Sequence, residues 1–140
     1  MFVVGGESLI DLKAEVALPD GTLIGHDGEN QIVMTAHPGG SPYNCAIALA
    51  KLGNPTGFLC PISTDAFGDY LLGPLAEAGV TPLLPERVKD YTTLAVVNFD
   101  ANHNARYGFY RSADGAMEAE KGIAALPEQL DLYQIGGFCP

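Results

Sequence analysis

Apolar and polar positions alternate in blocks along the first part of the chain. An apolar run at residues 2–4 stops at two glycines and resumes at residues 9–10, which predicts one strand, broken near its carboxyl end, from which Asp11 emerges. The next segment, 14–29, carries Pro-Asp-Gly and Asp-Gly sequences that cannot continue a helix, so we expect a solvent-exposed loop. A weak alternation at residues 32–36 predicts a second strand.

The rest of the chain continues with strands and helices in turn. Residues 44–52 are apolar on most sides and are followed by Gly53 and Pro55, which predicts a buried helix that ends there. Alternation of this kind predicts an α/β fold, in which helices cover a parallel sheet and ligands bind at the carboxyl ends of its strands. The other expected elements are strands at 57–62, 80–84 and 130–135, helices at 67–78 and 116–123, and a hairpin of 93–99 with 107–110 whose loop is 100–104.

The composition narrows the range of partners and compartments. The 140 residues are 47% hydrophobic, which is enough for the core of one domain, and their formal charge of −10 offers no attraction to nucleic acid or an anionic membrane. A neutral small molecule is the easier partner. The three cysteines show no Cys-x-x-Cys spacing, which indicates buried thiols in a reducing compartment and no zinc site or disulfide framework. Without a basic leader or an apolar stretch of about 18 residues, we expect a cytoplasmic protein.

The corner before the first helix, Gly-Gly-Ser-Pro-Tyr-Asn at residues 39–44, is the most informative motif. Its two glycines let the backbone approach a ligand without a Cβ in the way, and Asn44 offers a donor and an acceptor where the first helical N–H groups are unpaired. Such a corner suits a neutral, hydroxyl-rich ligand. The alternative is a Gly-Pro turn with Asn44 as the helix cap, and Asp11 likewise either binds a ligand or caps a turn.

Three further segments complete a recognisable pattern. They are Gly-Glu-Ser-Leu-Ile-Asp at 6–11, Asp-Ala-Phe-Gly at 65–68, and Arg-Tyr-Gly-Phe-Tyr-Arg-Ser-Ala-Asp at 106–114. Together with the corner, they resemble in order and spacing the amino-terminal half of the ribokinase-like (PfkB) carbohydrate kinases. The last segment is similar to the one that fructokinases and 2-keto-3-deoxygluconate kinases place over the sugar. Ser63 departs from the family signature, which usually has glycine there, and we expect only a local change of turn.

The resemblance implies a sugar site and a role for each matching residue. Asp11 would accept hydrogen bonds from sugar hydroxyls, an arrangement that suits a carboxylate. From the residues alone, Arg111 is as well explained as a solvated surface group, and only one side of the strand before it can line a site. The substrate-binding residues implied in this way are Asp11, Gly39, Gly40, Asn44, Phe109, Tyr110 and Arg111.

The two β-rich stretches are explained by the same resemblance. It implies one ribokinase-like domain over residues 1–140, a Rossmann-like parallel sheet flanked by helices, in which residues of about 12–38 and 92–111 form a small β lid. A lid makes chemical sense because it keeps water from receiving the phosphate. An exposed lid sheet would also favour pairing between subunits, so we expect a homodimer through the lid.

The resemblance further implies parts that these residues lack. Such kinases carry a Gly-Ala-Gly-Asp anion hole, with the aspartate that acts as general base, and the nucleotide pocket in their carboxyl-terminal half, and no such motif occurs here. ATP and Mg²⁺ are therefore implied as cofactors by the family alone, with no catalytic residue in this chain. We expect a chain with an incomplete carboxyl-terminal half that stops mid-domain at Pro140, binds sugar weakly or not at all, and does not phosphorylate it by itself.

The functional hypothesis is that a full-length parent is an ATP-dependent carbohydrate kinase acting on a fructose-like hexose, a small-molecule substrate. A 2-keto-3-deoxygluconate kinase is the alternative, although those enzymes generally have tyrosines where this chain has Ala95 and Phe109. A non-catalytic sugar-binding module is a further alternative if the chain truly ends at Pro140. A dinucleotide-binding domain, suggested by Val-Val-Gly-Gly at 3–6, lacks the third spaced glycine.

Overall fold

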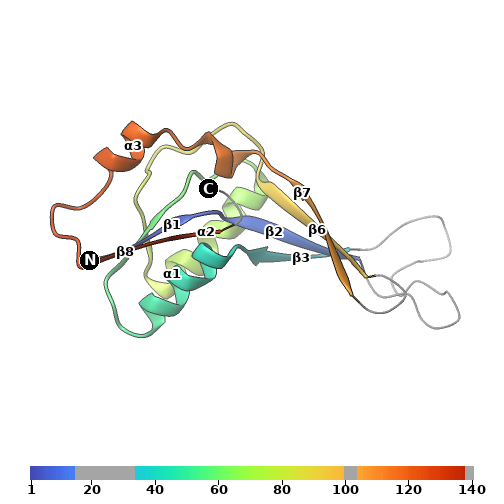
Figure 1. Ribbon diagram of the computed structural model, residues 1–140, viewed down its shortest axis with the longest axis horizontal. Coiled ribbons are helices and arrows are strands. Elements are labelled where there is room, and N and C mark those ends of the chain that lie inside the picture. Colours follow the sequence, from blue (N-terminus) through green and yellow to red (C-terminus); the bar gives the residue numbers. More distant parts are fainter. Residues whose placement is uncertain (15–33, 100–103, 138–140) are drawn as a thin grey trace, which may run out of the picture.

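Two four-stranded sheets organise the part of the protein that the structure describes (Figure 1). The computed structural model describes residues 1–14, 34–99 and 104–137. The first sheet has the order β5-β4-β1-β8, and every neighbouring pair in it is parallel. Its strands are β1 (Phe2–Gly6), β4 (Thr56–Leu59), β5 (Thr81–Pro82) and β8 (Leu132–Gly136).

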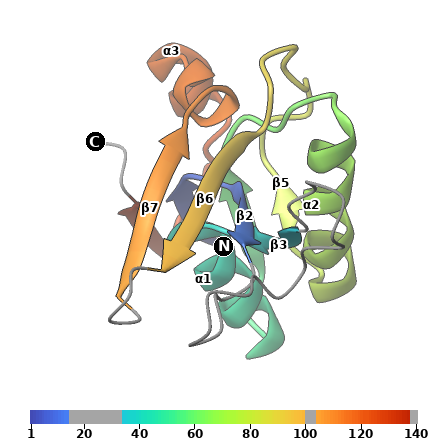
Figure 2. The same ribbon diagram turned by 90° about the vertical axis from the view of Figure 1, so that its right-hand side faces the viewer.

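Helices cover this parallel sheet on both sides. Helix α1 (Ser41–Lys51) packs against β1, β4 and α2 (Ala66–Ala78), while α3 (Ala119–Ala124) and the short 3₁₀ helix η1 (Ala113–Ala116) lie on the opposite side from α1 (Figures 1 and 2). The predicted α/β class, a parallel sheet flanked by helices, is therefore confirmed. Helix α1 ends as the sequence indicates, because Leu52 is its C-cap and Gly53 follows with a φ of 87°.

The core lies between the first sheet and its helices α1 and α2. Tyr43 and Phe58 are almost completely buried and meet edge to face, with ring centroids 5.9 Å apart. The Tyr43 hydroxyl donates a hydrogen bond to the Leu71 carbonyl at 2.8 Å, and burial raises the pKa of Tyr43 to about 12. This hydroxyl joins α1 to α2 while remaining uncharged.

The second sheet extends away from the first (Figure 1). Its order is β3-β2-β6-β7: β2 is antiparallel to β3 and parallel to β6, and β6 is antiparallel to β7. The expected hairpin of 93–99 with 107–110 is thus confirmed as β6 and β7. The strands are β2 (Leu9–Ala14), β3 (Met34–Gly39), β6 (Thr93–Phe99) and β7 (Ala105–Tyr110).

The single strand predicted over residues 2–11 is wrong, because the chain leaves one sheet for the other there. Strand β1 ends at Gly6 and β2 begins at Leu9, so Asp11 is the third residue of a strand and does not follow a strand end. Gly6 allows the change of direction: its φ is 146°, and a Cβ there would collide with the Gly136 carbonyl and the Pro42 ring.

Several predicted boundaries also shift for local reasons. Helix α1 begins at Ser41, three residues before the expected start, because Pro42 is acceptable in a first helical turn. Strand β4 ends at Leu59, before Pro61, which has no N–H for a ladder. The helix expected at 116–123 is divided into η1 and α3, with Met117 extended between them. The predicted loops at 14–29 and 100–104 lie largely outside the described residues, as does Cys139.

Candidate sugar site

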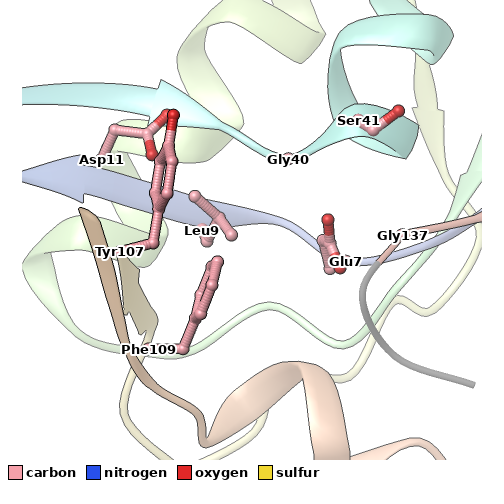
Figure 3. Close-up of a pocket in the computed structure, with 8 residues that line it drawn as sticks. All are labelled: Glu7, Leu9, Asp11, Gly40, Ser41, Tyr107, Phe109 and Gly137. Atoms are coloured by element: carbon pink, nitrogen blue, oxygen red, sulfur yellow. The ribbon is translucent and has the colours of Figure 1, made fainter. Parts of the chain in front are cut away.

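A cavity of about 550 Å³ lies between the carboxyl end of β1, the start of α1 and the inner face of the second sheet (Figure 3). Two carboxylates, two aromatic rings and backbone at two glycines contribute to its lining. This position agrees with the expectation that ligands bind beyond the carboxyl ends of parallel strands. The lining residues are Glu7, Leu9, Asp11, Gly40, Ser41, Tyr107, Phe109 and Gly137.

The strand register of the second sheet determines which side chains face this cavity. Leu9 and Asp11 lie on the same face of β2 because side chains alternate along a strand. Asp11 pairs with Ala95 of β6, which in turn pairs with Phe109 of β7. Tyr107 lies two residues before Phe109 and therefore on the same face. Three adjacent strands thus combine a carboxylate with two aromatic rings.

Glycines allow the backbone to approach both carboxylates closely. Gly40 has a φ of 106°, and a Cβ on it would lie 2.7 Å from the Glu7 carbonyl oxygen. A Cβ on Gly137 would lie 2.5 Å from the Glu7 carboxylate, and one on Gly39 would collide with the Asp11 carboxylate. A side chain at Gly39 or Gly137 would displace a carboxylate, and one at Gly40 would collide with the Glu7 backbone. In this structure, the groups that the glycine pair approaches closely are Glu7 and Asp11.

The residues proposed from the sequence are distributed unevenly around the cavity. Asp11, Gly40 and Phe109 line it, and Gly39 lies against the Asp11 carboxylate. Asn44 is an exposed residue of α1 and is outside the lining set; its backbone N–H donates to the Gly40 carbonyl at 3.0 Å as part of the helix.

Tyr110 and Arg111 lie outside the lining set as well. Tyr110 is 67% exposed and pairs with Leu94, so it is on the opposite face of the sheet from Phe109. The Arg111 Nε lies 3.8 Å from a carboxylate oxygen of Asp114, whose side chain is 2% exposed. The Thr93 hydroxyl donates to Asp114 and accepts from the Ser112 N–H at 3.0 Å. This network ties the segment after β7 to the start of β6.

Five lining residues were not proposed from the sequence. Tyr107 could have been found, since alternation along β7 places it on the same face as Phe109. Glu7 stands inside the recognised segment 6–11, but only the approach of Gly40 and Gly137 makes it a wall of the cavity. The side-chain types of Leu9, Ser41 and Gly137 do not by themselves mark a ligand site. The residue types alone therefore could not have identified them.

Cys60 is a buried residue of the core. Burial raises the pKa of its thiol to about 12, and the thiol donates to the Pro61 carbonyl at 3.4 Å. In the described ranges, no group of three or more histidine, cysteine, aspartate or glutamate side chains could hold a metal ion. None of the helices in those ranges is both long and apolar enough to cross a membrane.

The fold and the family can now be compared with those of known proteins. The pfkB family carbohydrate kinase description matches residues 1–140, so this chain belongs to that family. It is 34% identical over 139 residues to a fructokinase of Rhizobium leguminosarum bv. trifolii, covering 99% of this chain and 39% of that protein. It is 38% identical over 78 residues to a 5-dehydro-2-deoxygluconokinase of Photobacterium profundum, covering 56% of this chain and 22% of that protein.

Solved structures of sugar kinases share the fold of this chain. The fructokinase of Xylella fastidiosa with bound ATP superposes with a TM-score of 0.69 at 32% identity, over 86% of this chain and 34% of that one. A ribokinase of Giardia lamblia shares the fold, with a TM-score of 0.74 at 20% identity over 96% of this chain and 41% of that one. The predicted ribokinase-like fold is confirmed. The chain spans well under half the length of each of these proteins.

Proposed function

We propose that the full-length polypeptide containing these residues transfers the γ-phosphoryl group of ATP to a hydroxyl of a fructose-like hexose, and that the cavity between the two sheets receives the sugar. The observation that carries this proposal is that Glu7 and Asp11 both line the cavity, with backbone at Gly40 close to Glu7 and backbone at Gly39 close to Asp11. Carboxylates accept hydrogen bonds from hydroxyl donors, and each charge-assisted bond of this kind contributes about 1.5–3 kcal/mol.

Charge supports a neutral sugar over a sugar acid. Within the part of the chain that the structure describes, the cavity is lined by two acidic side chains and by no lysine, arginine or histidine. A substrate carboxylate would meet like charges there, which disfavours binding in a partly desolvated site. Asp11 is the residue to which we assign the main contact with sugar hydroxyls, with Gly39 and Gly40 permitting close approach.

A sugar acid such as 2-keto-3-deoxygluconate is the second candidate substrate. The likeness to a 5-dehydro-2-deoxygluconokinase favours it, and Arg111, close to the end of β7, is the cation that would meet its carboxylate. For this, Arg111 would have to leave the Asp114 carboxylate and pair with the substrate carboxylate instead. We keep Asn44, Tyr110 and Arg111 as proposed sugar contacts. Because they are not among the residues that line the cavity, they would have to come closer to the sugar to bind it.

The remaining components of the reaction belong to the proposal on the strength of the family. ATP is the phosphoryl donor, and Mg²⁺ would accompany it by neutralising phosphate charge. The described residues offer no cluster of metal-ligating side chains, so none of them is assigned to that ion. We also propose that the second sheet acts as a lid and that its exposed surface pairs in a homodimer. Tyr110, on the face of β7 opposite Phe109, is 67% exposed, as a sheet surface open to a partner would be.

A substrate panel tests the proposal. The full-length polypeptide is assayed for ADP release with ATP, Mg²⁺ and each of D-fructose, D-ribose and 2-keto-3-deoxygluconate. We expect the highest kcat/KM with fructose. A higher kcat/KM with 2-keto-3-deoxygluconate would establish the second candidate, and no phosphorylation of any sugar would overturn the kinase proposal.

A further inference from the structure

A buried carboxylate lies beside the candidate sugar site, at the point where β7 leads into η1. The side chain of Asp114 is 2% exposed and accepts a hydrogen bond from the Thr93 hydroxyl. Thr93 is itself buried and pairs in register with Leu9, which lines the cavity. Side chains that pair in register lie on the same face of a sheet, so Thr93 brings Asp114 to the cavity face of the second sheet. Asp114 is not among the lining residues, and it therefore adjoins the cavity without entering it.

The cation next to this carboxylate is Arg111, whose Nε lies 3.8 Å from an Asp114 carboxylate oxygen. Arg111 is the second residue after Phe109, which lines the cavity. Continuing the alternation of β7 by one residue places Arg111 on the same face as Phe109. The chain is still tied to β6 at this point, because the Ser112 N–H donates to the Thr93 hydroxyl oxygen at 3.0 Å. The Arg111 side chain is 47% exposed, so part of it meets the acid and part meets water.

The two partners of this ion pair differ in how freely they move. Asp114 is held by the Thr93 hydroxyl, and its backbone is fixed next door, where the Ala113 N–H donates to the Tyr91 carbonyl at 2.9 Å. A buried carboxylate that lost its cation would leave an uncompensated charge. An arginine side chain, in contrast, is long and changes rotamer while its head stays in water. Asp114 is therefore the fixed member of the pair, and it determines where the positive charge of Arg111 lies.

The ion pair also determines which charge the site offers to a substrate. Within the described residues, Glu7 and Asp11 line the cavity and no cation does, which suits a neutral sugar. A sugar acid would need a cation, and the charge of Arg111 is already offset by Asp114. An amide at position 114 would still accept the hydrogen bond from Thr93, but it would carry no charge to hold the guanidinium.

We propose that Asp114 is a specificity-determining residue that acts through Arg111: it holds the guanidinium and offsets its charge, so that the site prefers neutral sugars to sugar acids. It is a positioning residue and touches no substrate. This inference rests on the proposed function and deepens it, because the choice between the two candidate substrates is assigned to a residue outside the cavity lining.

The ratio of kcat/KM for 2-keto-3-deoxygluconate to kcat/KM for D-fructose tests this inference in the full-length polypeptide with ATP and Mg²⁺. Asp114→Asn should raise the ratio about 5- to 10-fold, because the freed guanidinium forms a charge-assisted, half-exposed contact with the substrate carboxylate. A damaged fold would lower both values of kcat/KM and leave their ratio unchanged. Glu118→Gln is the matched control, since it also removes one negative charge and releases Lys121 from an ion pair of 2.9 Å, outside the cavity lining. Its ratio should equal that of the wild type.

A double-mutant cycle shows whether Arg111 carries the effect. Arg111→Gln should lower kcat/KM for 2-keto-3-deoxygluconate about 5- to 10-fold more in the Asp114→Asn background than in the wild-type background. The dissociation constant of 2-keto-3-deoxygluconate, measured by titration calorimetry without ATP, should follow the same pattern. Binding is thereby separated from the phosphoryl transfer step.

The outcomes separate this inference from the function on which it rests. If Asp114→Asn keeps the wild-type ratio while the wild type phosphorylates fructose, the inference is wrong and the proposed function stands. If the ratio rises equally with and without Arg111, the acid acts by its own charge and the positioning role is wrong. A wild type that prefers 2-keto-3-deoxygluconate would overturn both the inference and fructose as the first substrate, but not the kinase function. If the wild type neither binds nor phosphorylates any sugar, the proposed function falls as well.

Discussion

The two sheets differ in how much of their surface is covered. All four residues of β4 in the first sheet are buried, whereas all six residues of β7 in the second are exposed. Strands β1 and β4 of the first sheet place apolar side chains in the core beneath the helices, and they therefore contribute to stability. The second leaves aromatic rings facing a cavity. Side chains of the first sheet should thus determine stability, and inner-face side chains of the second should determine ligand binding.

Removing a buried aromatic ring from the first sheet should have the largest effect on the free energy of unfolding. Phe58 is completely buried and packs edge to face on Tyr43, so Phe58→Ala should lower the free energy of unfolding by about 3–5 kcal/mol. Tyr107→Ala, an aromatic substitution of similar size in the second sheet, should change it by only about 0.5 kcal/mol. Urea denaturation measures both. Equal destabilisation by the two substitutions would remove the distinction between the sheets.

A side chain at the glycine corner should affect both stability and binding. Gly40→Ala introduces a Cβ at a φ of 106°, 2.7 Å from the Glu7 carbonyl oxygen. Such strain costs about 1–3 kcal/mol, and the displaced backbone should also raise the KM for sugar. Gly53→Ala is the control, since Gly53 has a φ of 87° but nothing within 4 Å of its would-be Cβ. Thermal unfolding and sugar kinetics of the two variants should differ; identical behaviour would show that contact with Glu7 is unimportant.

The cap of α2 should make stability depend on acid pH. Burial of Asp65 raises the pKa of its carboxyl, but hydrogen bonds from the Thr92 N–H and hydroxyl and from the Gly68 N–H outweigh this and hold the pKa below its ordinary value. The stabilisation is complete above the unfolded pKa of about 3.9 and is lost as pH falls through the lower folded value.

Substitution of Asp65 tests this dependence. Asp65→Ala should cost about 1 kcal/mol at pH 7 and lose less stability than the wild type as pH falls below 4. Asp90→Asn, a change at an exposed acid, should leave the wild-type profile intact. Denaturation series at several pH values provide the comparison. A wild-type slope that survives in Asp65→Ala would assign the dependence to other carboxyls.

The smallest effect concerns the thiol reactivity of Cys60, which follows β4, and of Cys45 in α1. Since the pKa of Cys60 is raised to about 12 by burial, its thiolate is scarce near neutral pH and iodoacetamide should modify it slowly in the native protein. Cys45 is only half-buried and should react faster. Peptide mapping after timed labelling distinguishes them. Rapid modification of native Cys60 would show that the core around β4 opens more readily than the buried strand indicates.

Local signals predicted the fold better than they predicted the site. The end of α1 at Gly53 follows from residue chemistry that acts over a few positions. The exit from the first sheet at Gly6 was missed. The apolar runs on either side of the glycines fit one broken strand as well as they fit two strands in different sheets. Asp11 was identified as a candidate, but its position inside β2 depends on that exit.

The composition of the cavity depends still more on long-range contacts. Glu7 lines the cavity only because Gly40 and Gly137 approach it from distant parts of the chain. Tyr107 was within reach of sequence reasoning through the alternation of β7. Asn44, in contrast, has the chemistry of a ligand-binding residue but lies on an exposed side of α1. Residue type suggested the kind of ligand, and strand register selected which residues face the cavity.

The kinetics of Asp11→Asn test the central claim, that this cavity binds the sugar, most directly. Asparagine keeps the size of the side chain and removes the charge, so the KM for D-fructose should rise about 10- to 100-fold while the KM for ATP stays the same. Asp90→Asn should change neither constant. An unchanged KM for fructose in Asp11→Asn would contradict the account.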